Sequence, residues 1–108
     1  MPMLNKLVRD KIPQIIRKSG KKPVSKKLNQ EQYINELRKK TQEELQEYLT
    51  AETDEEALEE LADLLEIIHS LAKVHGSTIE EVDKIRVDKA AKRGGFTDKV
   101  FLIEVQDE

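Results

Sequence analysis

Residues 55–75, EEALEELADLLEIIHSLAKVH, carry the pattern that decides the fold. Two adjoining apolar rows run through this stretch at helical spacing: Leu58, Leu61, Leu65 and Ile68, and beside them Ala57, Leu64, Ile67 and Leu71. An apolar arc this wide is more than one neighbouring helix can cover. We therefore predict a central helix over about residues 55–75, in contact with more than one partner.

Further helices are predicted on both sides of this stretch. Asp10 can cap a short helix that runs to about residue 18, and Asn29 is a good N-cap for a long helix that reaches about residue 50. After Gly76, Ser77 and Glu80 match a capping box that opens a last helix, which runs to about residue 93. The prediction is an all-α bundle of about four helices in one domain over residues 1–108.

Two short segments lack a helical stripe and read as extended chain. They are residues 22–28 and residues 99–105, one near each end of the sequence. Neither is stable alone as a strand, but each could supply the hydrogen-bonding partner that the other lacks. We predict a small β-hairpin formed by these two segments.

The composition narrows the classes of function. The chain has no Cys, which excludes disulfides, thiolate nucleophiles and Cys-ligated zinc. Lys6 and Arg9 come too early for a signal peptide, and no apolar run is long enough to span a bilayer. We expect a cytoplasmic protein with no membrane partner. Because charged helices this short bury a modest core, we also expect a homodimer or homotetramer.

The charge is distributed unevenly along the chain. Residues 1–30 hold nine Lys and Arg against the single acid Asp10, whereas residues 31–108 have a formal charge of −11. A basic segment can bind nucleic acid, but this one has no aromatic side chain on which a base could stack. We therefore do not expect nucleic acid to be a partner. We expect the basic part to complement the acidic body or to meet a phosphorylated small molecule.

Two acidic pairs stand on the predicted helices, Glu44-x-x-Glu47 and Glu60-x-x-Asp63. A spacing of three residues places both members of a pair on one helical face. Glu44 and Glu60 fall on the apolar rows of their helices, where a solvated charge should not be. If the helices pack side by side, four carboxylates converge, and a divalent cation would relieve their repulsion. Oxygen ligands favour Mg²⁺ or Mn²⁺ over zinc.

Basic residues near both ends are candidates for phosphate binding. They are Lys6, Arg9 and Lys11 in the first segment, and Lys89, Lys92 and Arg93 at the end of the last predicted helix. Lys and Arg are natural partners of phosphate oxygens. The second group could equally be a cationic helix end closed by Gly94 and Gly95. Both interpretations stay open on the sequence alone.

The order of these motifs resembles a known superfamily. Glu43-Glu44-x-x-Glu47 followed by Glu60-x-x-Asp63 resembles the E-E-x-x-E…E-x-x-D signature of the MazG-like all-α nucleoside triphosphate pyrophosphohydrolases. The opening Asn5-Lys-Leu-Val-Arg-Asp-Lys-Ile-Pro13 and the ending Lys92-Arg-Gly-Gly-Phe96 are similar to a phosphoribosyl-ATP pyrophosphohydrolase-like branch. Taken in order, these motifs extend over most of the chain.

The resemblance implies a fold, a reaction and a set of residues. It implies a MazG-like helical bundle that cleaves a nucleoside triphosphate between the α and β phosphates, giving a monophosphate and pyrophosphate. The metal ligands would be Glu44, Glu47, Glu60 and Asp63, with Mg²⁺ as the cofactor and Mn²⁺ as a substitute. Glu43 would be a nearby acid that acts as a base or orients the water, so Glu43 and Glu44 are the catalytic candidates.

Two other functions remain open at this point. The first is hydrolysis of phosphoribosyl-ATP in histidine biosynthesis, although Leu64, Leu65 and Glu66 stand where that enzyme would have an aromatic residue and a His. The second is a non-enzymatic helical interaction module whose acids are only solvated. Binding of Mg²⁺ distinguishes this module from both enzymes.

Overall fold

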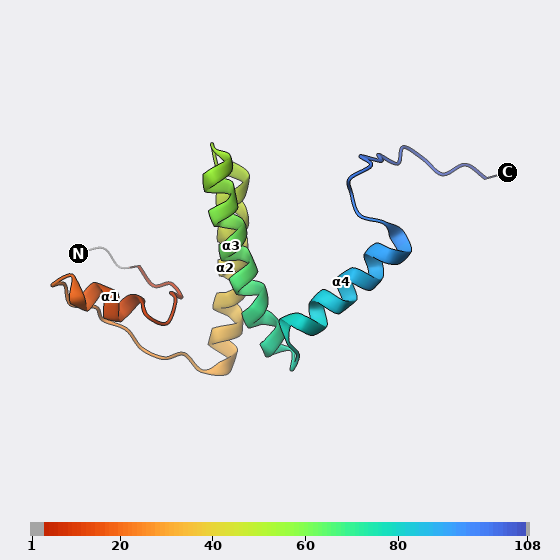
Figure 1. Cartoon of the computed structure of the whole chain (residues 1–108). Coiled ribbons are helices and arrows are strands. Elements are labelled where there is room, and N and C mark those ends of the chain that lie inside the picture. Colours follow the sequence, from red (N-terminus) through yellow and green to blue (C-terminus); the bar gives the residue numbers. More distant parts are fainter. Residues whose placement is uncertain (1–3, 108) are drawn as a thin grey trace.

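A computed structural model describes residues 4–107, and within this range the protein is all-helical (Figure 1). Four helices follow one another along the chain: α1 (Ile12–Lys18), α2 (Gln30–Thr50), α3 (Asp54–Val74) and α4 (Ile79–Arg93). The all-α class and the number of helices are confirmed. Among residues 4–107 no helix is both long enough and apolar enough to cross a membrane.

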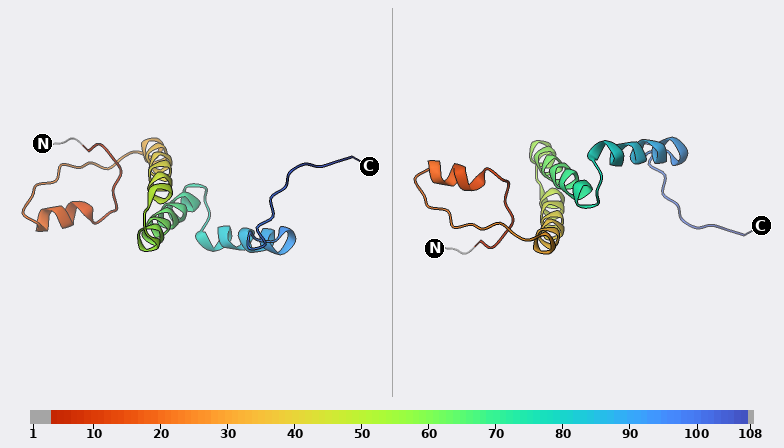
Figure 2. Two further views of the ribbon diagram at one scale, coloured as in Figure 1. Left: turned by 90° about the horizontal axis from the view of Figure 1, so that it is seen from above. Right: turned by 90° about the horizontal axis from the view of Figure 1, so that it is seen from below.

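The long helices α2 and α3 lie side by side and form the centre of the molecule (Figures 1 and 2). Asn29 caps α2 as predicted: its side chain accepts a hydrogen bond from the Gln32 backbone N–H at 2.9 Å, and Gln32 Oε1 accepts one from the Asn29 N–H. Thr53 caps α3 by accepting from the Glu56 N–H at 3.1 Å. Only residues 51–53 connect the two helices, so they run antiparallel.

The core between α2 and α3 is small. Within residues 4–107 the buried apolar side chains are Leu37, Ile67 and Ala72. The row of α3 that contains Ile67 is buried or half-buried along its whole length, as expected of a face packed on α2. The other row of α3 is exposed at every position: Leu58, Leu61, Leu65 and Ile68. Within one chain, therefore, only half of the apolar arc of α3 is covered.

Helix α4 turns away from this pair. The chain leaves α3 through Gly76, whose φ of +73° suits a residue without a Cβ atom, and restarts at Thr78, whose side chain accepts from the Glu81 N–H at 3.2 Å. The N-cap is thus one residue later than the capping box at Ser77 predicted. Helix α4 contacts α3 near its start and then projects outward, followed by an extended C-terminal segment (Figure 1).

The predicted β-hairpin is not formed in the structure. No strand occurs among residues 4–107, and neither 22–28 nor 99–105 pairs with another segment. The two segments lie on opposite sides of the α2–α3 pair in all three views (Figures 1 and 2). A strand needs a neighbour for its backbone N–H and C=O groups, and at this separation neither segment can serve the other.

Candidate metal centre

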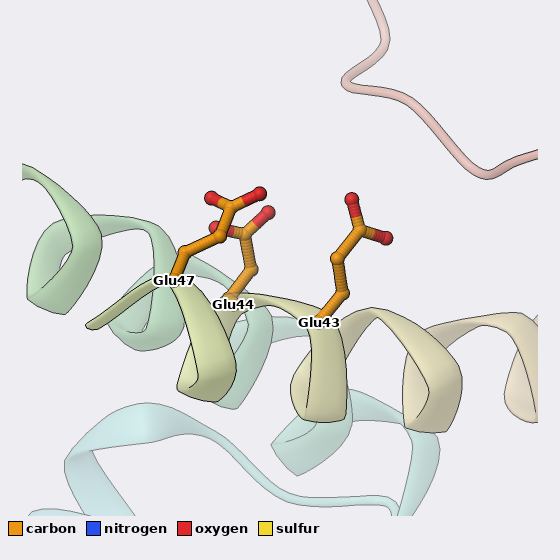
Figure 3. A group of neighbouring side chains, drawn as sticks. All are labelled: Glu43, Glu44 and Glu47. Atoms are coloured by element: carbon orange, nitrogen blue, oxygen red, sulfur yellow. The ribbon is translucent and has the colours of Figure 1, made fainter. Parts of the chain in front are cut away.

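Acidic side chains from α2 and α3 converge on one site. Carboxylate oxygens of Glu44, Glu60 and Asp63 lie within 4.8 Å of one another, and those of Glu43, Glu44 and Glu47 form a second group within the same distance. Glu44 belongs to both groups and joins them. The three acids of α2 point to the same side of the helix (Figure 3). The antiparallel register of the two helices thus brings together all four predicted metal ligands, with Glu43 beside them.

Glu44 is the buried member of this cluster. It is 6% exposed and is the single charged residue among the buried residues of the described chain. Glu60 and Asp63 are half-buried, whereas Glu43 and Glu47 are exposed. One oxygen of Glu44 and one of Glu60, both Oε2, are buried without a hydrogen-bond partner. Such oxygens cost folding free energy unless something binds them, and a cation is the natural partner for two converging carboxylates.

The carboxyl groups perturb one another's protonation. The Glu47 carboxylate, which can share a proton with Glu60, raises the pKa of Glu60 to about 7, and burial adds to this rise. Burial, followed by the neighbouring Glu47, raises the pKa of Glu44. The Glu60 and Glu44 carboxyls lower the pKa of Glu47. The carboxyl cluster therefore holds a proton near neutral pH in place of part of its negative charge.

One cation of α2 lies against the cluster and was not predicted as a site residue. Lys40 Nζ is 3.6 Å from Glu44 Oε1 and 3.8 Å from Glu43 Oε1. The sequence spacing could have indicated this contact, because Lys40 precedes Glu44 by four residues and therefore lies on the same face of α2. A single ammonium group cannot balance five carboxylates. Lys40 leaves most of the negative charge of the cluster for another partner.

The N-terminal segment supplies two further cations. Arg9 Nη2 is 2.6 Å from Asp63 Oδ1, and Lys6 is close enough to help lower the pKa of Glu47. The reddish N-terminal trace passes on the side toward which the α2 carboxylates point (Figure 3). Of the predicted phosphate-binding residues, Arg9 thus pairs with Asp63 of α3, and the charge of Lys6 acts on Glu47 of α2. In this structure the partner of Arg9 is a carboxylate.

The other predicted phosphate-binding residues are placed elsewhere. Lys11 is exposed at the start of α1. The remaining three, Lys89, Lys92 and Arg93, are exposed on the outer half of α4, which leads away from the acidic cluster (Figure 1). Arg93 lines an open hollow of about 510 Å³ formed by the exposed turn that follows α4, together with residues 94–100. Within one chain the structure brings none of these three to the carboxylates.

The ligand set suits a hard divalent cation. Every candidate ligand atom is a carboxylate oxygen, with no His or Cys among them. Mg²⁺ and Mn²⁺ favour such oxygen ligands, whereas structural zinc sites favour nitrogen and sulfur. The partnerless oxygens of Glu44 and Glu60 are ligand atoms of the kind that a cation of this class would need.

Comparisons with known proteins name no family or activity. No family model matches the chain, and no solved structure matches it. A protein from Mycolicibacterium smegmatis, described as uncharacterized, is 45% identical over 53 residues. The match covers 49% of this chain and 54% of that protein, so the chain spans about half the length of the relative it matches.

Proposed function

We propose that this protein is a nucleotide pyrophosphohydrolase dependent on Mg²⁺ or Mn²⁺. It would cleave a nucleoside triphosphate between the α and β phosphates, giving a nucleoside monophosphate and pyrophosphate. One observation carries the proposal: Glu44, a buried carboxylate with a partnerless oxygen, joins the acids of α2 to those of α3. A charge in that position is costly unless a cation binds there.

Each residue of the site has a role in this proposal. Four acids would hold the cation: Glu44, Glu47, Glu60 and Asp63. When bound, a divalent cation would neutralise the negative charge that develops on the pyrophosphate leaving group. Glu43, exposed at the rim and next to Lys40, would orient the attacking water and accept its proton on a carboxylate oxygen. Lys6 and Arg9 would bind phosphate oxygens.

The sequence motifs support the same assignment. The E-E-x-x-E and E-x-x-D motifs of the MazG-like superfamily coincide with the acids that α2 and α3 bring together. The all-helical fold agrees with membership in that superfamily. We therefore propose that the chain is a MazG-like domain and that the convergence of its acids is the feature on which its activity depends.

We also propose that the working form is a homodimer or homotetramer. The solvent-accessible area is 10269 Å², against about 6,200 Å² for a compact monomer of this mass. The radius of gyration is 18.8 Å, against about 13 Å for a compact chain of this length. An open groove of about 540 Å³ lies between α3 and α4, and its apolar lining includes Leu65, Ile68 and Val82. A second copy of the chain could cover these residues with its own identical surface, as in a symmetric homodimer.

A panel of nucleotides tests the reaction. Purified protein with Mg²⁺ is incubated with canonical and modified nucleoside triphosphates and with phosphoribosyl-ATP, and pyrophosphate and orthophosphate are measured separately. Pyrophosphate and a monophosphate as primary products support the proposal, and the substrate preference separates the general from the histidine-biosynthetic activity. Orthophosphate and a diphosphate would mean attack at the terminal phosphorus and would contradict it. No turnover together with no binding of Mg²⁺ or Mn²⁺ would favour the interaction module.

A further inference from the structure

The contact between Arg9 and Asp63 differs from every other ion pair in the described chain. It joins residues 54 positions apart at 2.6 Å, whereas the other salt bridges among residues 4–107 link side chains three or four positions apart on one helix. It is the ion pair that connects the N-terminal segment to the α2–α3 pair. Its acidic partner is one of the four proposed metal ligands.

The pair is placed so that it can be exchanged. The Arg9 side chain is 58% exposed and that of Asp63 is 39% exposed, so water reaches both groups. An ion pair this accessible contributes little to stability and is readily replaced by a stronger partner. Glu44 and Glu60, which lie beside Asp63, each have a buried oxygen without a hydrogen-bond partner. A divalent cation that binds those oxygens would therefore also compete with Arg9 for Asp63.

We propose that Arg9 is an exchangeable counter-ion of this site, an inference that rests on the proposed function. Without a divalent cation the guanidinium neutralises Asp63. When the cation takes Asp63, the guanidinium is released within reach of the same site and binds a phosphate of the nucleotide. The planar guanidinium suits this exchange because it forms paired hydrogen bonds with carboxylate and with phosphate alike. The same segment carries a second positive charge at Lys6, which helps to lower the pKa of Glu47 on α2.

If this exchange occurs, one substitution should change the affinities for the metal ion and for pyrophosphate in opposite directions. In Arg9→Gln, apparent affinity for Mn²⁺ without nucleotide should rise by about two- to fivefold, because the competitor for Asp63 is gone. Affinity for inorganic pyrophosphate in the presence of Mn²⁺ should fall by roughly tenfold, because a phosphate ligand is gone. Electron paramagnetic resonance of free Mn²⁺ and calorimetry with pyrophosphate measure the two quantities without turnover.

Two controls separate the exchange from a general effect of charge. Arg17→Gln removes the same group from an exposed position at the end of α1 and should change neither affinity by more than about twofold. In an Asp63→Asn background, Arg9→Gln should no longer raise the affinity for Mn²⁺, because the two side chains act as a pair. Circular dichroism checks that each variant keeps its helicity.

The outcomes are distinguishable from those of the proposed function. Wild-type protein that binds no Mn²⁺ would overturn both. Wild-type protein that binds Mn²⁺, with an Arg9→Gln variant that loses affinity for both ligands or changes in neither, would overturn the exchange alone. An equal rise in Mn²⁺ affinity in the Asp63→Asn background would also overturn it, because the effect would then not pass through Asp63.

Discussion

The α2–α3 pair and the C-terminal part of the chain, which consists of α4 and the segment after it, differ in how much of their apolar surface is packed. Side chains cap all three of these helices, at Asn29, Thr53 and Thr78, but only the pair buries apolar residues such as Leu37 and Ile67. Helix α4 has no buried residue, and the segment after it leaves Phe96 98% exposed and Ile103 90% exposed. The acidic site therefore lies where the chain packs on itself. The C-terminal part leaves its apolar side chains exposed, so changes in the two regions should have different consequences.

The largest effect is expected from Glu44 in the packed region. Glu44→Gln keeps the size of the side chain but removes the charge that a cation needs. We expect pyrophosphate release to fall by at least ~100-fold, about 2.7 kcal/mol of transition-state stabilisation, while helicity and assembly are retained. Glu31→Gln, at an exposed position in the first turn of α2, is the control and should keep nearly full activity. Activity near the wild-type level in Glu44→Gln would mean that the reaction does not depend on the acidic site.

The next effect concerns the apolar side chains that the chain leaves exposed, which include one row of α3. Leu65 lies on the exposed row of α3 and lines the open groove between α3 and α4. If a second copy covers this row, as proposed, Leu65→Lys should place a charge in the interface and destabilise the assembly by about 2 kcal/mol per protomer. Light scattering at micromolar concentration should show a smaller mass than for the wild type.

Val24 supplies the matched control for this substitution. It is 96% exposed in the extended segment between α1 and α2, away from α3. Val24→Lys should leave the mass unchanged. A wild-type protein that scatters as a monomer would contradict the proposed assembly, whatever Leu65→Lys does.

A third prediction returns to the packed region and to the cation itself. Binding to the folded state alone stabilises it, by about 1.4 kcal/mol when the free cation is at about ten times its Kd. Mg²⁺ should therefore raise the melting temperature by several degrees relative to EDTA. Glu60→Gln should reduce this gain, and Glu59→Gln, at an exposed neighbouring position on the same helix, should keep it. Equal melting curves with Mg²⁺ and with EDTA would contradict a shared metal site.

The sequence predicted the packed region well, because its signals are local. The side chain of Asn29 and the wide apolar arc of α3 each act within one helix, so periodicity and capping were enough. The burial of Glu44 was also foreseeable, since it falls on an apolar row. The contact between Arg9 and Asp63 was not, because it spans 54 positions and depends on where the N-terminal segment lies.

The two extended segments and α4 were predicted less well for a related reason. The hairpin expected of residues 22–28 and 99–105 required a tertiary contact that the chain does not make. Extended character can be read from local residue types, but the partner of a strand is set by the arrangement of everything between the two segments. The same holds for Lys92 and Arg93, whose distance from the acids follows from the direction that α4 takes after Gly76.

The smallest effect is the response of the metal-free protein to pH. The pKa of Glu60 is raised from 4.5 to about 7, chiefly by the Glu47 carboxylate, so between these values the folded state binds a proton that the unfolded state has lost. Stability from this group is fully present below about pH 4.5 and is lost as the pH rises through about 7. The lowered pKa of Glu47 acts in the opposite direction and reduces the net change.

In EDTA, the melting temperature of wild type minus that of Glu60→Gln should therefore fall between about pH 5 and about pH 8. Saturating Mg²⁺ should reverse the slope, because protons then compete with the cation for the same oxygens. A difference that stays constant with pH in EDTA would mean that Glu60 and Glu47 do not share a proton, and that the carboxylates of α2 and α3 are farther apart in solution than in the structure.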